Sequence, residues 1–160
     1  MDPEKLFYSG TDGFSLKTLL AKCEGNKPTI MLLKTTHGNP FVTYNSSIYH
    51  HTGAIIGAFL TDEWKLSPKN YYGDGDSFVF TLAPKERKYD WTARCSFFTM
   101  ITEKFLSIGG GKDGKSAIYL DTTSLMSGKS QRSETFGNDI LTGNSSEDFS
   151  VSSIEIYSFV

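Results

Sequence analysis

The amino-acid sequence predicts a mainly β protein with a few short helices, in which two antiparallel sheets pack as a β-sandwich. Fifteen glycines and an aromatic content of 14% favour strands joined by many turns. The apolar runs are short and end at glycine, proline or small polar residues, as expected for strands. A single segment has the apolar spacing of a helix, so helices should only flank the sheets.

The one helix that the spacing predicts lies near the N-terminus. Its apolar residues fall at i, i+3, i+4 and i+7 and therefore form one stripe, made of Leu16, Leu19, Leu20 and Cys23. Asp12 or Ser15 can cap the start of this helix, and Gly25 can close its end.

The remaining apolar runs predict strands over residues 28–33, 54–60, 77–82, 95–100, 105–108, 117–120 and 151–159. The segment 64–72 reads as irregular, with a short helix expected near Ser67. Apolar and polar residues alternate along the last run, so we expect Ser158-Phe159-Val160 to end a strand of the protein's own sheet. That placement argues against a free C-terminal ligand for a strand-adding domain.

Composition predicts one domain over residues 1–160 and excludes several classes of protein. A net charge of -2 gives no basic face for nucleic acid, and no apolar run reaches the ~20 residues of a membrane span. The start, Met1 to Lys5, is too polar for a secretory signal. We expect a cytoplasmic protein in which Cys23 and Cys95 are buried free thiols.

Residues 109–116, Gly-Gly-Gly-Lys-Asp-Gly-Lys-Ser, match the phosphate-loop pattern in every fixed position. That pattern requires a helix after the loop, whose N-terminus faces the phosphates. Here the loop is followed by Ala-Ile-Tyr-Leu, a short apolar run ending at a turn-like cluster. Two strands around a glycine-rich loop make a hairpin, so we interpret the match as a decoy.

No complete catalytic or metal-binding set is found in the sequence. His50 and His51 are adjacent and would point to opposite faces of a strand, and His37 lies in a turn. These histidines read as solvent-exposed rather than as zinc ligands. A serine hydrolase would need a nucleophile elbow, and no Gly-x-Ser-x-Gly occurs. We therefore expect no catalytic residue, metal or cofactor, and no enzyme.

Four aspartates stand in turns, where they could offer negative charge to a protein partner: Asp12, Asp74, Asp76 and Asp121. The competing interpretation is that each one forms a turn or caps a helix. With Glu63, the pair at 74 and 76 supplies too few oxygens for calcium, which takes six to eight.

Taken in order, these pieces resemble the TLDc domain family over nearly the whole chain, from Leu6 to Phe159. The segments that carry the resemblance are Gly-Phe-Ser-Leu-Lys-Thr-Leu at 13–19, Ile-Gly-Ala-Phe at 56–59 with Trp64, Tyr-Tyr-Gly-Asp-Gly-Asp-Ser-Phe-Val-Phe at 71–80, the glycine hairpin at 108–121, Ser-Glu-Thr-Phe-Gly-Asn at 133–138, and 147–159. Their number, order and spacing are together quite specific.

The chain departs from the family pattern at several positions. Asp74 and Asp76 stand where Thr and Glu are usual, Glu134 replaces a common cysteine, and Tyr157 a frequent tryptophan. Residues 39–52 look like an insertion. The side chain of Asp76 is shorter than that of the usual glutamate and therefore reaches less far.

The resemblance implies a β-sandwich flanked by short helices and a part in protection against oxidative damage, without an established active site. It also implies binding to the vacuolar-type proton ATPase and regulation of its assembly. Other members join the domain to a TBC domain of the Rab GTPase-activating kind, as in Skywalker-type proteins of synaptic vesicle and endosomal traffic. On this basis we expect an excised domain or a short member, cytoplasmic or at vesicle, endosomal or lysosomal membranes through its parent protein.

Two further hypotheses stay open. A direct thiol antioxidant would act through Cys95, which follows Arg94, or through Cys23, which the helical stripe argues against. A module for sugars or phosphoinositides would use aromatic and basic loop residues: Tyr44, Tyr49, Trp64, Lys65, Lys69 and Lys88.

Overall fold

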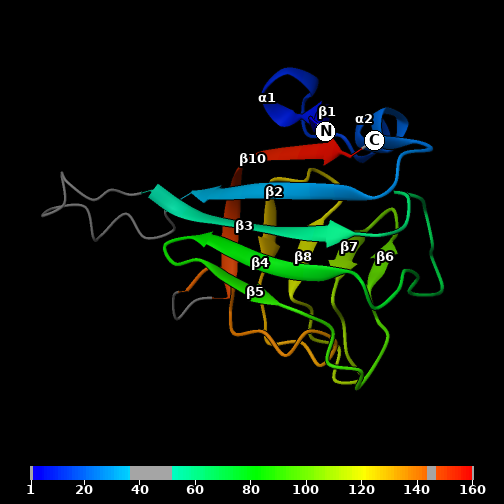
Figure 1. Cartoon of the computed structure of the whole chain (residues 1–160). Coiled ribbons are helices and arrows are strands. Elements are labelled where there is room, and N and C mark those ends of the chain that lie inside the picture. The colour runs from blue at the N-terminus through cyan, green and yellow to red at the C-terminus, as the bar shows by residue number, and fades with distance from the viewer. Residues whose placement is uncertain (1, 37–51, 144–146, 160) are drawn as a thin grey trace, which may run out of the picture.

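A computed structural model of the chain describes residues 2–36, 52–143 and 147–159. The described residues form a mainly β, antiparallel fold with two short helices (Figure 1). In chain order the elements are β1 (Glu4–Tyr8), α1 (Ser9–Asp12), α2 (Leu16–Cys23), β2 (Thr29–Thr36), β3 (Thr52–Leu60), β4 (Phe78–Ala83), β5 (Arg87–Tyr89), β6 (Thr99–Ile101), β7 (Phe105–Ile108), β8 (Ile118–Asp121), β9 (Ser127–Lys129) and β10 (Asp148–Ser158). This confirms the predicted mainly β, antiparallel fold with short helices, whereas the packing of two sheets as a sandwich stays a prediction.

The strands form one hydrogen-bonded path, β5-β4-β3-β2-β10-β9-β8-β7-β6. β1 lies outside this path and pairs with β10. The long strand β10 links the two halves of this path. Its residues 148–150 pair with β9, and its residues 151–158 pair with β2. The register shifts between Val151 and Ser153, where the strand passes from one half to the other. The two sheets expected from the sequence are therefore joined through β10.

Both halves of the sheet contribute side chains to one hydrophobic core. Burial alternates along β2, and along β10 on either side of Ser152 and Ser153, so one face of each of these stretches points into this core. Its fully buried members include Met31, Leu33 and Ile56 from one half and Leu106, Ile108 and Ile118 from the other. The predicted pairing of the C-terminal strand within the protein's own sheet is confirmed, because β10 lies between β1 and β2.

The predicted helix is confirmed as α2, and the Ser15 hydroxyl caps it by accepting a hydrogen bond from the Thr18 amide at 3.3 Å. The whole apolar stripe packs toward the core, but to different depths. Leu19 and Cys23 are buried, whereas Leu16 and Leu20 are only partly covered. Both helices lie beside β1 at one edge of the molecule (Figure 1).

Two local predictions are wrong. The strand expected over 95–100 is shorter, because β6 begins only at Thr99. There is also no helix near Ser67; the segment is irregular, as predicted for 64–72, and bonds to the outer edge of β6 at Ser67 and Tyr72. There the Ser67 amide donates to the Ile101 carbonyl at 2.8 Å, and Tyr72 exchanges two backbone hydrogen bonds with Thr99. This cover removes an open strand edge.

The strands β1, β5 and β9 and the one-turn helix α1 were not expected from the sequence. In the part of the chain that the structure describes, no helix has both the length and the apolar character to cross a membrane.

Candidate functional site

The glycine-rich loop joins β7 to β8 as a hairpin, as predicted. The two strands pair antiparallel, and no helix follows the loop. Two of the loop's backbone donors are already bonded to carboxylates, and those of Gly109, Gly110 and Gly114 to backbone carbonyls. The Lys112 amide donates to Glu134 Oε1 at 2.8 Å, and the Lys115 amide to Asp113 Oδ1 at 3.0 Å. A phosphate cradle needs such amides to be available, so this geometry does not fit one.

Ser116, the last residue of the phosphate-loop pattern, has a structural role. It is buried, and its hydroxyl lies 2.7 Å from the hydroxyl of Ser107, which lies 2.8 Å from the Tyr71 hydroxyl. The Tyr71 ring packs so tightly on Gly110 that a Cβ there would lie 2.5 Å from its oxygen. These contacts fix the hairpin against the loop that holds Tyr71.

Asp12, the first predicted docking acid, is held by internal contacts. Its Oδ2 accepts a hydrogen bond from the Tyr8 amide at 2.9 Å, and its Oδ1 lies 3.5 Å from Lys22 Nζ. The hydrogen bond from Tyr8 is the main reason that the pKa of Asp12 is lowered, with the charge of Lys22 adding to it. Asp12 thus ties β1 to α2.

Asp121 closes the turn after β8. Its Oδ1 accepts hydrogen bonds from the Thr123 hydroxyl at 2.6 Å and from the Thr123 amide at 2.9 Å. These bonds lower the pKa of Asp121. These contacts fit the interpretation that Asp12 and Asp121 form turns or caps. The docking role of both residues stays a prediction.

Asp74 and Asp76 are both exposed, in a turn before β4. Asp74 Oδ1 accepts a hydrogen bond from the Asp76 amide at 3.0 Å. The neighbouring Gly75 packs against Trp91, whose side chain is partly exposed. Asp76 makes no side-chain hydrogen bond or ion pair with another described residue. Among the four predicted acids, this pair is the most available to a partner. One hydrogen bond joins Asp74 to Asp76, whereas Asp12 and Asp121 each bond within a separate turn.

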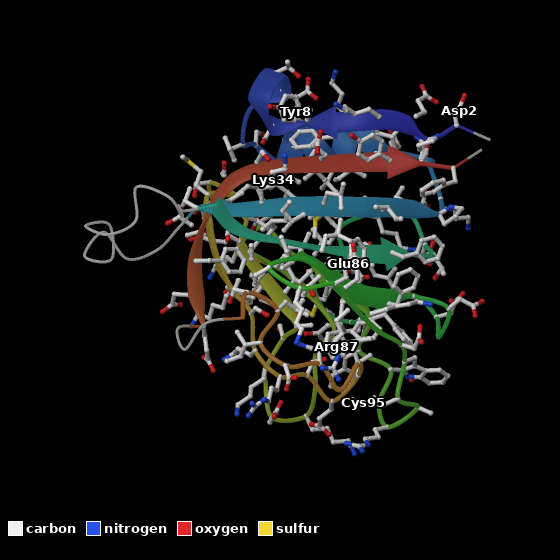
Figure 2. All side chains as sticks on the ribbon, turned by 60° about the vertical axis from the view of Figure 1, so that its left-hand side comes forward. Asp2, Tyr8, Lys34, Glu86, Arg87 and Cys95 are labelled. Carbon is white, nitrogen blue, oxygen red and sulfur yellow. The ribbon has the colours of Figure 1, made fainter. Side chains whose placement is uncertain are left out.

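The two cysteines are free and buried, as predicted. Burial of Cys23 raises the pKa of its thiol to about 12, which leaves almost no reactive thiolate at neutral pH. Cys95 lies in the loops on the far side of the molecule from Tyr8 (Figure 2). Its Sγ is 3.4 Å from the Thr135 hydroxyl, and its side chain is 9% exposed. Neither environment favours direct thiol chemistry.

The proposed sugar or phosphoinositide module can be checked only at those of its residues that lie within the described ranges. Trp64 is buried, and its indole N–H donates to the Thr29 hydroxyl at 2.8 Å, so the stacking role suggested for Trp64 is wrong. Lys88 pairs with Asp90 at 3.1 Å. Tyr44, Tyr49, His37, His50 and His51 lie outside the described residues. Within the described ranges, no group of three or more metal-ligating side chains is present.

An open apolar groove of about 730 Å³ lies between α2 and the turns that follow β6 and β8. Two of its apolar side chains, Leu66 and Met126, are 49% and 51% exposed. The groove is lined by Phe14, Ser15, Leu16, Lys17, Leu20, Leu66, Glu103, Thr122, Thr123, Ser124 and Met126. Asp121 shapes one wall, since it closes the turn that presents Thr122 to Met126.

Sequence reasoning missed this groove because its lining comes from four separate segments of the chain. Two signals in the sequence could have pointed to it. Leu66 lies in a polar, irregular stretch, and Met126 lies between serine-rich turns. An apolar side chain in such a loop has no strand or helix to bury it.

The fold and these surfaces define an antiparallel β domain that presents an acidic turn and an apolar groove. The family model described as "TLDc domain" matches residues 1–160. The chain belongs to this TLDc family, as the sequence resemblance indicated. Similar proteins include Oxidation resistance protein 1 of Rattus norvegicus, 35% identical over 98% of this chain, and Nuclear receptor coactivator 7 of Mus musculus, 32% identical over 98%. The GTPase-activating protein skywalker of Drosophila melanogaster is 29% identical over 99%.

These relatives are much longer than the chain. It covers 17% of the oxidation resistance protein, 15% of the coactivator and 26% of skywalker. The shared region is thus one domain within proteins of different names.

Proposed function

We propose that this domain is a non-enzymatic protein-interaction module that binds the vacuolar-type proton ATPase and regulates its assembly. Membership of the TLDc family supports the proposal, since that family resemblance implies this partner. A link to oxidative-stress resistance follows from the name of the relative Oxidation resistance protein 1. Through this partner the domain would act at vesicle, endosomal or lysosomal membranes.

The observation that carries the proposal is the open groove with its half-exposed Leu66 and Met126. Exposed apolar side chains gathered in one concave surface are typical of protein contact sites. The exposed carboxylates of Asp74 and Asp76 would add charge complementarity to a basic partner surface.

Co-migration of the domain with the purified ATPase in size-exclusion chromatography tests the proposal, with proton pumping followed in parallel. Reversing both charges, with Asp74→Lys and Asp76→Lys, should abolish co-migration and lower thermal stability only slightly, since both side chains are exposed and the change removes a single hydrogen bond, from the Asp76 amide to Asp74 Oδ1. Glu86→Lys is the matched control, because Glu86 is also exposed and lies on the loop before β5. Loss of binding together with stability would assign the two acids a structural role only.

A second candidate function is that of a domain in a GTPase-activating protein of vesicle traffic. The similarity to the GTPase-activating protein skywalker over 99% of this chain favours it. If the domain fails to bind the ATPase, this candidate takes first place, and capture by trafficking GTPases is the next assay.

A further inference from the structure

The groove beside α2 concentrates apolar surface that nothing in the described structure covers. Four large hydrophobic side chains are exposed among the described residues, and the two most exposed, Leu66 and Met126, both line it. Leu16 and Leu20 of α2, which are partly buried and pack against the core, line it as well. A methionine suits such a site because its flexible thioether side chain adapts to the shape of a partner.

The groove can contact a partner through its side chains, but few of its backbone groups are free to hydrogen-bond with an added strand. In its wall the amides of Thr122, Thr123 and Leu125 donate to the Lys104 carbonyl, Asp121 Oδ1 and the Asp121 carbonyl, respectively. On the opposite side the Thr18 amide is capped by Ser15. An added strand needs free backbone groups along an edge, so a partner must bind here through its side chains. A helix satisfies its own backbone and suits this requirement.

The size and openness of the groove favour a macromolecular partner. A volume of about 730 Å³ falls within the range of small-molecule pockets, roughly 300–1,000 Å³. Such pockets, however, enclose their ligand, whereas Leu66 and Met126 keep about half of their surface exposed at 49% and 51%. A partner that buries both must extend beyond the groove.

The polar side chains of the lining give the partner a charge pattern. Lys17 and Glu103 are exposed, and neither forms an ion pair with a described residue. We propose that the groove binds an amphipathic α-helix of a partner protein, with apolar side chains against Leu66 and Met126, an acidic residue beside Lys17 and a basic residue beside Glu103. The inference deepens the proposed docking function and rests on it, but it does not depend on which protein supplies the helix.

Synthetic peptides test this inference without the ATPase, so its failure and that of the ATPase proposal can be told apart. The probes are three helix-stabilised 16-residue peptides with the same leucine stripe, flanked by mixed, all-acidic or all-basic residues. A fourth probe carries the mixed flanks and a central proline that breaks the helix. Binding is measured by fluorescence anisotropy of labelled peptide and by amide shifts of the ¹⁵N-labelled chain.

The mixed peptide should bind best and shift the amides of residues 14–20 and 122–126, and the proline peptide should not bind. The double variant Leu66→Asn with Met126→Gln should weaken binding at least about tenfold, as loss of central contact residues does. Leu82→Asn is the matched control, since Leu82 is 46% exposed and lies outside the groove; it should change the affinity less than about twofold.

The charged side chains of Lys17 and Glu103 provide the most specific test of the proposed helix. Glu103→Lys should reverse the preference, so that the acidic peptide binds about 3- to 10-fold better than the mixed one. Absence of amide shifts in the groove, equal binding of the proline peptide, or no loss in the Leu66 and Met126 double variant would overturn the inference. So would an unchanged flank preference in Glu103→Lys.

Discussion

Substitutions at Ser116 and Lys115 distinguish a phosphate loop from a structural hairpin. Ser116→Ala removes a buried hydroxyl that lies 2.7 Å from the Ser107 hydroxyl, which keeps its contact with Tyr71. Because a buried polar group then loses one of its partners, we expect a cost of about 1–2 kcal/mol in the free energy of unfolding. Lys115 is exposed, and Lys115→Ala should change that free energy by less than about 0.5 kcal/mol.

Urea unfolding followed by tryptophan fluorescence measures both effects, provided that the slope of the transition is the same in each variant. Ser107→Ala should cost more than Ser116→Ala, since it leaves both Tyr71 and Ser116 without this partner. The double variant should cost less than the two single losses together, because they share one contact.

The reasoning fails if Ser116→Ala leaves stability unchanged or if Lys115→Ala is equally destabilising. A third result would restore the phosphate-loop interpretation. It is a rise in the urea midpoint of the wild-type chain on addition of ATP and magnesium that is lost in Lys115→Ala.

Three further predictions concern single side chains. Because the pKa of Asp121 is lowered in the folded state, its ionised carboxylate stabilises the fold above the ordinary aspartate pKa, and this stabilisation is lost as the pH falls through the lower folded pKa. Asp121→Asn should therefore reduce the fall of the melting temperature at acidic pH, and an unchanged fall would contradict the prediction. Cys23, with its pKa of about 12, should resist iodoacetamide at pH 7.5 in the folded chain and react in urea, as mass spectrometry of peptides can show. Trp64→Phe should lower the free energy of unfolding by about 1–3 kcal/mol, because it leaves the buried Thr29 hydroxyl without its donor. Adding Thr29→Val should recover part of that loss, and no recovery in urea unfolding would argue against the hydrogen bond.

The sequence located the elements that have a strong apolar pattern. α2 and the strands β2, β3, β4, β7, β8 and β10 lie where the pattern placed them, within a few residues at each end. β5 and β9 were not predicted because each is three residues long and has charged residues or glycine where an apolar alternation would be needed. Such strands form because a neighbour offers backbone groups, and a single sequence does not reveal that neighbour.

The predicted strand over 95–100 failed because its first residues make their hydrogen bonds with loops. The Cys95 carbonyl accepts from the Trp91 indole at 2.7 Å, and the Phe97 amide donates to the Thr135 hydroxyl at 3.2 Å. The joining of the two sheets through β10 was hidden for a similar reason. Buried residues alternate on each side of Ser152 and Ser153, where the alternation changes phase and the register shifts, but this break does not reveal which strands pair with each part.

The candidate site was only partly predictable. Turn chemistry identified Asp121 and Asp74 as residues whose carboxylates bond nearby backbone amides, and both do so. The groove could not be predicted in the same way, because α2, Leu66, Glu103 and Met126 meet only in the folded chain.

The most direct test of the docking account is proton pumping by the purified vacuolar-type ATPase while the domain is titrated in. The account predicts a saturable change in pumping at the concentrations where the domain co-migrates with the enzyme. It also predicts that the change is lost in the Leu66→Asn, Met126→Gln double variant and kept in Leu82→Asn, whose side chain is 46% exposed outside the groove. Neither binding nor any change in pumping with the folded wild-type domain would contradict the account.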